Sequence, residues 1–251
     1  MELLDEHGRV FGIVNIIDLL VVLFVVAVGI AGIALVVGPD EPSEPSEPSE
    51  PSEPQVTQTV TVGLGTHPPE GAALIEPGAV EFGGTNATMT DVYRTPNGDG
   101  ARVIVRLQVQ GQMDSNVFTV GGAPVRYGSV FSVTTPDYQH DGNIIGVGGN
   151  DSISTTPVTA TLTATVSPAT ADAVEPGDEY QLAGQTVATI RDVSRNQTED
   201  EQVQLTVRAA FVARDTASGP MYGDAPIRIG RNLTIATNRY QFTGQVADVE
   251  Q

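Results

Sequence analysis

The pattern of hydrophobic and polar positions changes twice along the chain. Leu19 to Val37 is an uncharged apolar run, long enough to cross about 30 Å of hydrocarbon as a helix. Glu41 to Pro54 then repeats Glu-Pro-Ser without any aliphatic or aromatic residue. Beyond residue 55, apolar residues alternate with polar ones, which is the period of a half-buried strand. The sequence therefore predicts a membrane helix, a spacer and an all-β region.

The apolar run follows a helix-start signal, because Asn15 is followed three residues later by Asp18. Arg9 flanks this side and the next Arg is Arg94, so the positive-inside tendency places the N-terminus in the cytoplasm. We predict a cytoplasmic leader at 1–12 and a single-pass transmembrane helix at 13–38 that contacts the lipid bilayer. The C-terminal part would then be extracellular. A cleaved signal peptide is the alternative, but the acidic start lacks a basic n-region.

The spacer covers residues 39–55 and has Pro at every third place of its repeat. This spacing favours polyproline II, and the like-charged Glu residues favour extension. At about 3.1 Å per residue the stalk would reach about 50 Å from the membrane. A flexible low-complexity linker is the alternative, and either form acts as a spacer.

The region beyond the stalk contains one pattern twice, at a spacing of about 100 residues. The matching segments are Glu76-Pro-Gly78 with Glu175-Pro-Gly177, Ala123-Pro-Val-Arg-Tyr-Gly128 with Ala225-Pro-Ile-Arg-Ile-Gly230, and Tyr138-Gln139 plus Gly142 with Tyr240-Gln241 plus Gly244. We predict two tandem homologous β-domains at 56–150 and 158–251, joined by a linker at 151–157.

Each predicted domain holds two units of turn, strand, turn and strand. Two such units would close a small β-barrel and remove exposed sheet edges, with a β-sandwich as the alternative. No helix is predicted beyond the membrane span. The paired glycines 78/177, 128/230 and 142/244 are assigned to turns that need positive φ. Tyr138 and Tyr240 are assigned to packing, and Arg126 and Arg228 are expected to face outward or to pair with a carboxylate.

The negative charge of the chain limits the classes of partner that it can bind. The net charge is −19, and all basic residues are Arg. Such a chain repels nucleic acid, so no nucleic-acid partner is expected. The Lys-free, acidic composition is typical of a halophilic protein, since at about 1 M salt the screening length falls to about 3 Å. An acidic surface protein of a mesophile is the alternative. The chain has no Cys and therefore no disulfide or thiolate chemistry.

Catalytic chemistry is not indicated by any motif. His7, His67 and His140 are not spaced as metal ligands, and no phosphate-binding Gly-rich loop precedes a helix. We therefore expect no enzyme activity, no catalytic residues, no metal and no cofactor. Four Asn-x-Ser/Thr sequons are candidate N-glycosylation sites of a glycoprotein: Asn86, Asn150, Asn196 and Asn232.

The start Asp5-Glu-His-Gly-Arg-Val-Phe-Gly12, followed by Asn15-Ile-Ile-Asp18, resembles the opening of the domain-of-unknown-function family numbered 4330. The resemblance extends over the leader, the helix and both repeats, although the duplication and the stalk depart from the family pattern. It implies membrane anchoring and no catalytic residues. A more distant likeness is to the mammalian-cell-entry domains of lipid transporters, through Gly177, Gly184 and Val187.

These features together predict a non-enzymatic cell-envelope protein that presents paired acidic β-domains to an unknown envelope protein or serves envelope structure. The alternative is a lipid or hydrophobe transport ring subunit. That alternative requires a homo-oligomer, which the small residues on one face of the membrane helix would allow.

Overall fold

The computed structural model describes residues 9–10, 14–15, 55–198 and 201–250. Near the N-terminus, β1 (Arg9–Val10) pairs antiparallel with β2 (Val14–Asn15). Val14 and Asn15, at the start of the predicted span at 13–38, are extended, and the rest of this span lies outside the described residues, so the membrane helix stays a prediction. Within the described part of the chain, no helix has the length and apolarity needed to cross a membrane.

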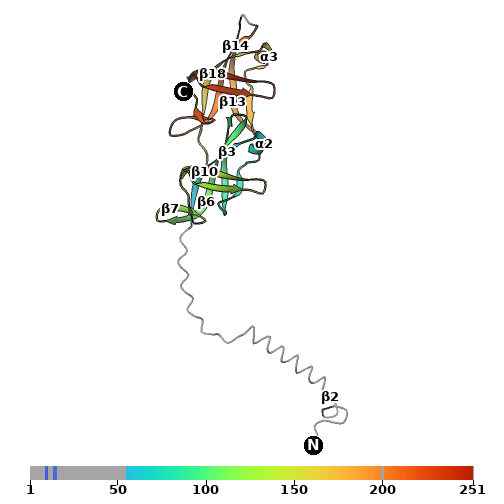
Figure 1. Ribbon diagram of the computed structural model, residues 1–251, viewed down its shortest axis with the longest axis vertical. Helices are drawn as coiled ribbons and strands as arrows, with labels where there is room; N and C mark the ends of the chain where they lie inside the picture. Colours follow the sequence, from blue (N-terminus) through green and yellow to red (C-terminus); the bar gives the residue numbers. More distant parts are fainter. Residues whose placement is uncertain (1–8, 11–13, 16–54, 199–200, 251) are drawn as a thin grey trace. The chain divides into compact units, whose positions relative to one another are not determined.

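The described residues beyond the stalk are all-β and form two eight-stranded antiparallel sheets, both visible in Figure 1. We call residues 55–147 the first module and residues 155–250 the second module. The strands of the first module are β3 (Gln55–His67), β4 (Gly78–Phe82), β5 (Thr85–Asn97), β6 (Gly100–Asp114), β7 (Val117–Val120), β8 (Ala123–Pro124), β9 (Val130–Thr134) and β10 (Gln139–Val147).

The sheet of the first module closes on itself. Its strands follow the order β3-β10-β9-β4-β5-β6, and β6 pairs again with β3. The link between β4 and β9 is short, with Glu81 opposite Thr134 and Phe82 opposite Val133. The ring encloses alternating side chains of β6, among them Val105 and Leu107, which are fully buried. The predicted alternation along β6 is confirmed.

The second module repeats this series of elements. Its strands are β11 (Thr155–Val166), β12 (Glu179–Leu182), β13 (Gln185–Gln197), β14 (Val203–Arg214), β15 (Met221–Tyr222), β16 (Ala225–Pro226), β17 (Asn232–Ala236) and β18 (Gln241–Glu250). The main order is β12-β13-β14-β11-β18-β17, and no pairing joins β12 to β17 among the described residues. The second sheet is therefore open where the first is closed.

Each module also contains a short helix that the sequence analysis did not predict. These are α2 (Pro69–Ala73) and α3 (Pro168–Ala173), each with Pro in the first turn. Ser167 caps α3, because its hydroxyl accepts a hydrogen bond of 3.2 Å from the N–H of Thr170. A Pro at the first helical position after a capping residue is a helix-start signal. The expectation of no helix beyond the membrane span was wrong.

An Arg holds the C-terminal end of each short helix. Arg94, which is 6% exposed, donates hydrogen bonds to the carbonyls of Ala72 at 3.0 Å and Ile75 at 2.5 Å. Arg195 donates in the same way to the carbonyls of Ala171 and Val174. Carbonyl groups at a helix end lack partners within the helix, so each guanidinium satisfies two of them.

The recurring glycines have two different roles. Those at 128, 177 and 230 lie in turns with positive φ, as predicted, whereas Gly78 is the first residue of β4, with φ of 157°. Gly142 and Gly244 lie inside β10 and β18 without positive φ, so their assignment to turns was wrong. A Cβ on Gly142 would come within 2.9 Å of Leu64, and one on Gly244 within 3.0 Å of Leu162. These two glycines are needed because neighbouring side chains pack directly against the strand.

Candidate functional site

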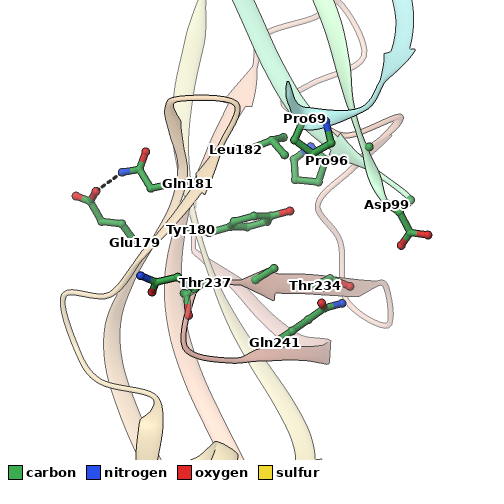
Figure 2. A pocket seen from close by; sticks show the side chains of 14 residues that line it. Pro69, Pro96, Asp99, Glu179, Tyr180, Gln181, Leu182, Thr234, Thr237 and Gln241 are labelled. Carbon is green, nitrogen blue, oxygen red and sulfur yellow. Dashed lines mark hydrogen bonds between the residues drawn. The ribbon is translucent and has the colours of Figure 1, made fainter. Parts of the chain in front are cut away.

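A cleft of about 650 Å³ lies beside β12 (Figure 2). Both modules contribute to its wall. The lining residues are Pro69, Pro96, Gly98, Asp99 and Gly100 from the first module, and Glu179, Tyr180, Gln181, Leu182, Thr234, Ala236, Thr237, Asn238 and Gln241 from the second. All four residues of β12 are among them, so the cleft lies along the unpaired edge of this strand.

The open edge has a local cause in the turn before β13. In the first module Gly83 occupies the corresponding turn, before β5, and its N–H donates a hydrogen bond of 3.0 Å to the carbonyl of Ser132, beside the β4–β9 link. A Cβ at Gly83 would meet the ring of Phe131 at 2.7 Å. The second module has Ala183 in the corresponding turn. Since a side chain cannot be accommodated at such a close approach, Ala183 favours separated strands.

Strand alternation divides the side chains of β12 between two sides. Tyr180 extends into the cleft, while Glu179 and Gln181 lie on the other side of the strand (Figure 2). Glu179 is held there, because its carboxylate accepts hydrogen bonds from the amide of Gln181 at 2.7 Å and the hydroxyl of Thr186 at 3.0 Å. The centre of the cleft is therefore lined by uncharged groups.

Two of the polar side chains that line the cleft, those of Tyr180 and Gln241, can bind a ligand. The hydroxyl of Tyr180 and the amide of Gln241 have no hydrogen-bond partner among the residues that the structure describes. Burial raises the pKa of Tyr180, so its hydroxyl stays protonated and can donate. The Gln241 amide offers two donors and one acceptor.

The two modules are joined beside the cleft by side-chain hydrogen bonds. The buried Tyr93 hydroxyl donates to the carbonyl of Val212 at 2.9 Å and to that of Met221 at 3.3 Å. Thr95, which is fully buried, accepts a bond of 2.6 Å from the N–H of Gly223. Because these bonds link β5 with the second sheet, the cleft has walls held by buried contacts.

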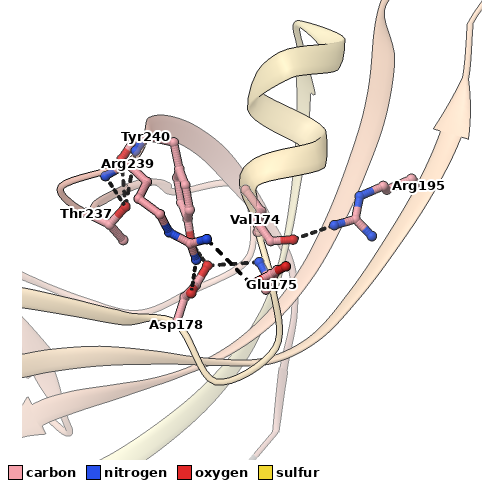
Figure 3. Close-up of polar contacts among 7 residues, drawn as sticks. All are labelled: Val174, Glu175, Asp178, Arg195, Thr237, Arg239 and Tyr240. Atoms are coloured by element: carbon pink, nitrogen blue, oxygen red, sulfur yellow. Dashed lines mark hydrogen bonds and ion pairs between the residues drawn. The ribbon is translucent and has the colours of Figure 1, made fainter.

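A polar cluster stabilises the end of the second module (Figure 3). The Tyr240 hydroxyl donates a hydrogen bond of 2.6 Å to the carboxylate of Asp178, and Arg239 forms ion pairs with Asp178 and, at 3.5 Å, with Glu175. Burial alone would raise the pKa of Asp178. The hydrogen bonds from Tyr240 and from the backbone of Glu175, together with the Arg239 guanidinium, outweigh burial and lower this pKa below its ordinary value.

Two histidines meet in the first module, which the sequence analysis did not foresee. The ring centroids of His67 and His140 lie 4.3 Å apart, and the ring of Tyr138 lies 5.5 Å from that of His140. Burial, followed by the neighbouring His67, lowers the pKa of His140. His7 lies outside the described residues. In the described ranges, no group of three His, Cys, Asp or Glu residues could hold a metal ion.

The four candidate glycosylation sites are all exposed. Asn86, Asn196 and Asn232 lie within strands. Asn150 follows β10, and its backbone carbonyl accepts a hydrogen bond of 2.6 Å from Arg106. The four side chains come from separate segments and do not form one site. Their glycan occupancy stays a prediction.

Other recurring residues lie where they were expected. Arg126 and Arg228 are exposed, and Tyr240 is buried. Tyr180, the central residue of the cleft, was missed, because its segment shows only the alternation of an ordinary strand. The substitution of Ala183 for the Gly83 of the other repeat was the one local signal of an open edge.

Comparison with known proteins gives a match to a family model. Residues 1–97 match the model of the family described as Domain of unknown function (DUF4330). The match ends within β5, so it covers the predicted leader, membrane span and stalk and part of the first module, and it does not extend to the second repeat. No curated protein and no solved structure matches the chain. The likeness to mammalian-cell-entry domains is not supported by these comparisons. The resemblance predicted from the leader is confirmed: the first 97 residues of this chain match the DUF4330 family.

Proposed function

We propose that the chain is a non-enzymatic, single-pass protein of the cell envelope that presents paired acidic β-modules on the outer face of the membrane. The observation that carries this proposal is the link between the modules. Tyr93 and Thr95 of the first module bond to backbone groups of the second, within one compact unit at 53–251. Two linked modules offer a continuous surface to a partner, which two freely moving domains would not.

We further infer that the modules are two forms of one small β-barrel, closed in the first and open in the second. The repeated order of strands and the shared Arg contacts to α2 and α3 support a common origin. The apolar run at 19–37 and the Glu-Pro-Ser repeat support an anchor and a stalk. The net charge of −19 suits a surface that stays soluble in strong salt.

Site-directed photocrosslinking in intact cells tests the proposal. A photoreactive residue replaces Tyr127 or Ile229, which are 81% and 68% exposed and lie in different modules. A third variant carries the same group at Glu2 of the predicted leader. We expect extracytoplasmic partners from the first two variants and cytoplasmic partners from the third. Recovery of only cytoplasmic proteins at Tyr127 and Ile229 would contradict the proposal.

A further inference from the structure

The chemistry of the cleft between β12 and β17 defines the kind of ligand that it suits. The carboxylates that line it, Asp99 and Glu179, belong to exposed residues, and Glu179 is turned away from Tyr180 (Figure 2). No basic residue is found among the described residues of the lining. An anionic ligand would therefore meet no positive charge, and its approach would be opposed by the acidic rim.

Apolar and polar side chains both face the inside of the cleft. Pro69, Pro96 and the buried Leu182 supply apolar surface, and the Tyr180 ring projects into the cleft beside this group. The Tyr180 hydroxyl and the Gln241 amide supply uncommitted hydrogen-bonding groups. A purely apolar ligand would leave both without partners, which costs free energy when water is displaced. The cleft is thus matched to a neutral ligand that has both C–H faces and many hydroxyl groups.

A second hollow lies beside the cleft, and its lining includes Arg231 and Asp224, which form an ion pair at 3.8 Å. It has a volume of about 170 Å³ and shares Pro96, Gly98 and Thr234 with the cleft. Tyr222 lines it, and its buried hydroxyl has no partner within the described residues. Buried polar groups are normally hydrogen-bonded, so an unpaired hydroxyl beside a cleft is consistent with a polar ligand or water at this place.

We propose that the cleft binds a neutral saccharide of one or two units. The sugar ring lies against Tyr180, and its hydroxyl groups bond with Gln241 and the Tyr180 hydroxyl. An aromatic ring presents a large flat surface at low cost in side-chain entropy, and planar amides suit vicinal hydroxyl groups. This inference goes beyond the proposed function and does not depend on where the modules are located.

Saturation-transfer difference NMR on the purified full-length chain provides the test. The chain is held in a zwitterionic detergent without a sugar headgroup, because alkyl glycosides would compete for the cleft. The probes form matched pairs of a neutral and an anionic sugar: glucose with glucuronate, and galactose with galacturonate. We expect saturation transfer to at least one neutral sugar and weaker transfer to its charged counterpart. Transfer to neither neutral sugar, or stronger binding of the charged forms, would overturn the proposal.

Variants connect the signal to the cleft. Tyr180→Ala is expected to weaken sugar binding about tenfold, which corresponds to about 1.4 kcal/mol. Tyr180→Phe keeps the ring and loses the hydroxyl, and Gln241→Ala removes the amide, so each should give a smaller loss. Tyr127→Ala, at an exposed Tyr outside the cleft, is the matched control and should change nothing. If Tyr180→Ala does not fold, the sugar affinities of Tyr180→Phe and Gln241→Ala test the site instead. Unchanged affinity in them would refute the site.

Discussion

The hydroxyl of Tyr240 donates a hydrogen bond of 2.6 Å to the carboxylate of Asp178, and the corresponding tyrosine of the other module has no such partner. Gly177 is followed by Asp178, whereas Gly78 is followed by Ala79. The hydroxyl of Tyr138 is consequently buried without a partner among the described residues. One recurring tyrosine therefore contributes a polar contact in the second module and leaves an unsatisfied group in the first.

This difference predicts that Tyr→Phe changes the free energy of unfolding differently at the two positions. Tyr240→Phe removes a hydrogen bond to a charged acceptor and should lower the free energy of unfolding by about 1.5–3 kcal/mol. Tyr138→Phe removes an unsatisfied buried hydroxyl and should be neutral or stabilising. Urea unfolding of both full-length variants, followed by circular dichroism, measures the two effects. An equal loss in both would contradict the assigned role of Asp178.

Acid sensitivity should depend on Asp178. Its pKa is lower in the folded protein than in the unfolded chain, so the folded state binds fewer protons. The resulting stability is present above about pH 3.9 and is lost as pH falls through the lower, folded pKa. Asp178→Asn should keep the acceptor for Tyr240 and remove this part of the pH dependence. Thermal unfolding between pH 5 and pH 2 compares the native chain with the Asp178→Asn variant. If the two plots of stability against pH run parallel, they argue against the prediction.

The two helix-end arginines should differ in importance. Arg94→Met leaves the buried carbonyls of Ala72 and Ile75 without their donors and should cost about 3 kcal/mol, at about 1.5 kcal/mol for each bond. Arg195 is exposed, so water can replace its contacts, and Arg195→Met should cost about 1 kcal/mol or less. Denaturant unfolding of the matched pair measures both values. A larger loss at Arg195 would show that burial does not set the cost.

The turn before β5, and the corresponding turn before β13, should control whether each sheet closes. Gly83→Ala places a Cβ against Phe131 at a residue with φ of 56°, and we expect a loss of about 1–3 kcal/mol. Ala183 already has φ of 48°, so Ala183→Gly should relieve strain of about 1 kcal/mol. The unfolding free energies of the two variants test these signs. Stabilisation by Gly83→Ala would remove the explanation for the open sheet.

Local pattern was sufficient to predict the strands. The alternation in β6 and β11 reflects one buried face, which is a property of neighbouring residues along the chain. The paired helices α2 and α3 were missed because each is a single short turn without helical periodicity. Their start signals, Pro69 and Ser167 with Pro168, were present in the sequence.

The site depended on contacts between residues far apart in the sequence. Tyr180 becomes a cleft residue only because β12 does not pair with β17 and because the loop at 96–100 of the other module lies opposite. The contact of His67 with His140 likewise follows from the packing of separate segments. Such long-range relationships leave no period in the sequence, so pattern analysis does not reveal them.

Labelling of single cysteines in intact cells tests the central claim most directly, since the native chain has no Cys. Tyr127→Cys and Ile229→Cys place a thiol at strongly exposed positions of the two modules, and Glu2→Cys places one in the leader. A membrane-impermeant maleimide should label the first two variants in intact cells and the third only after lysis. Protection of both modules until lysis would contradict their presentation outside the membrane.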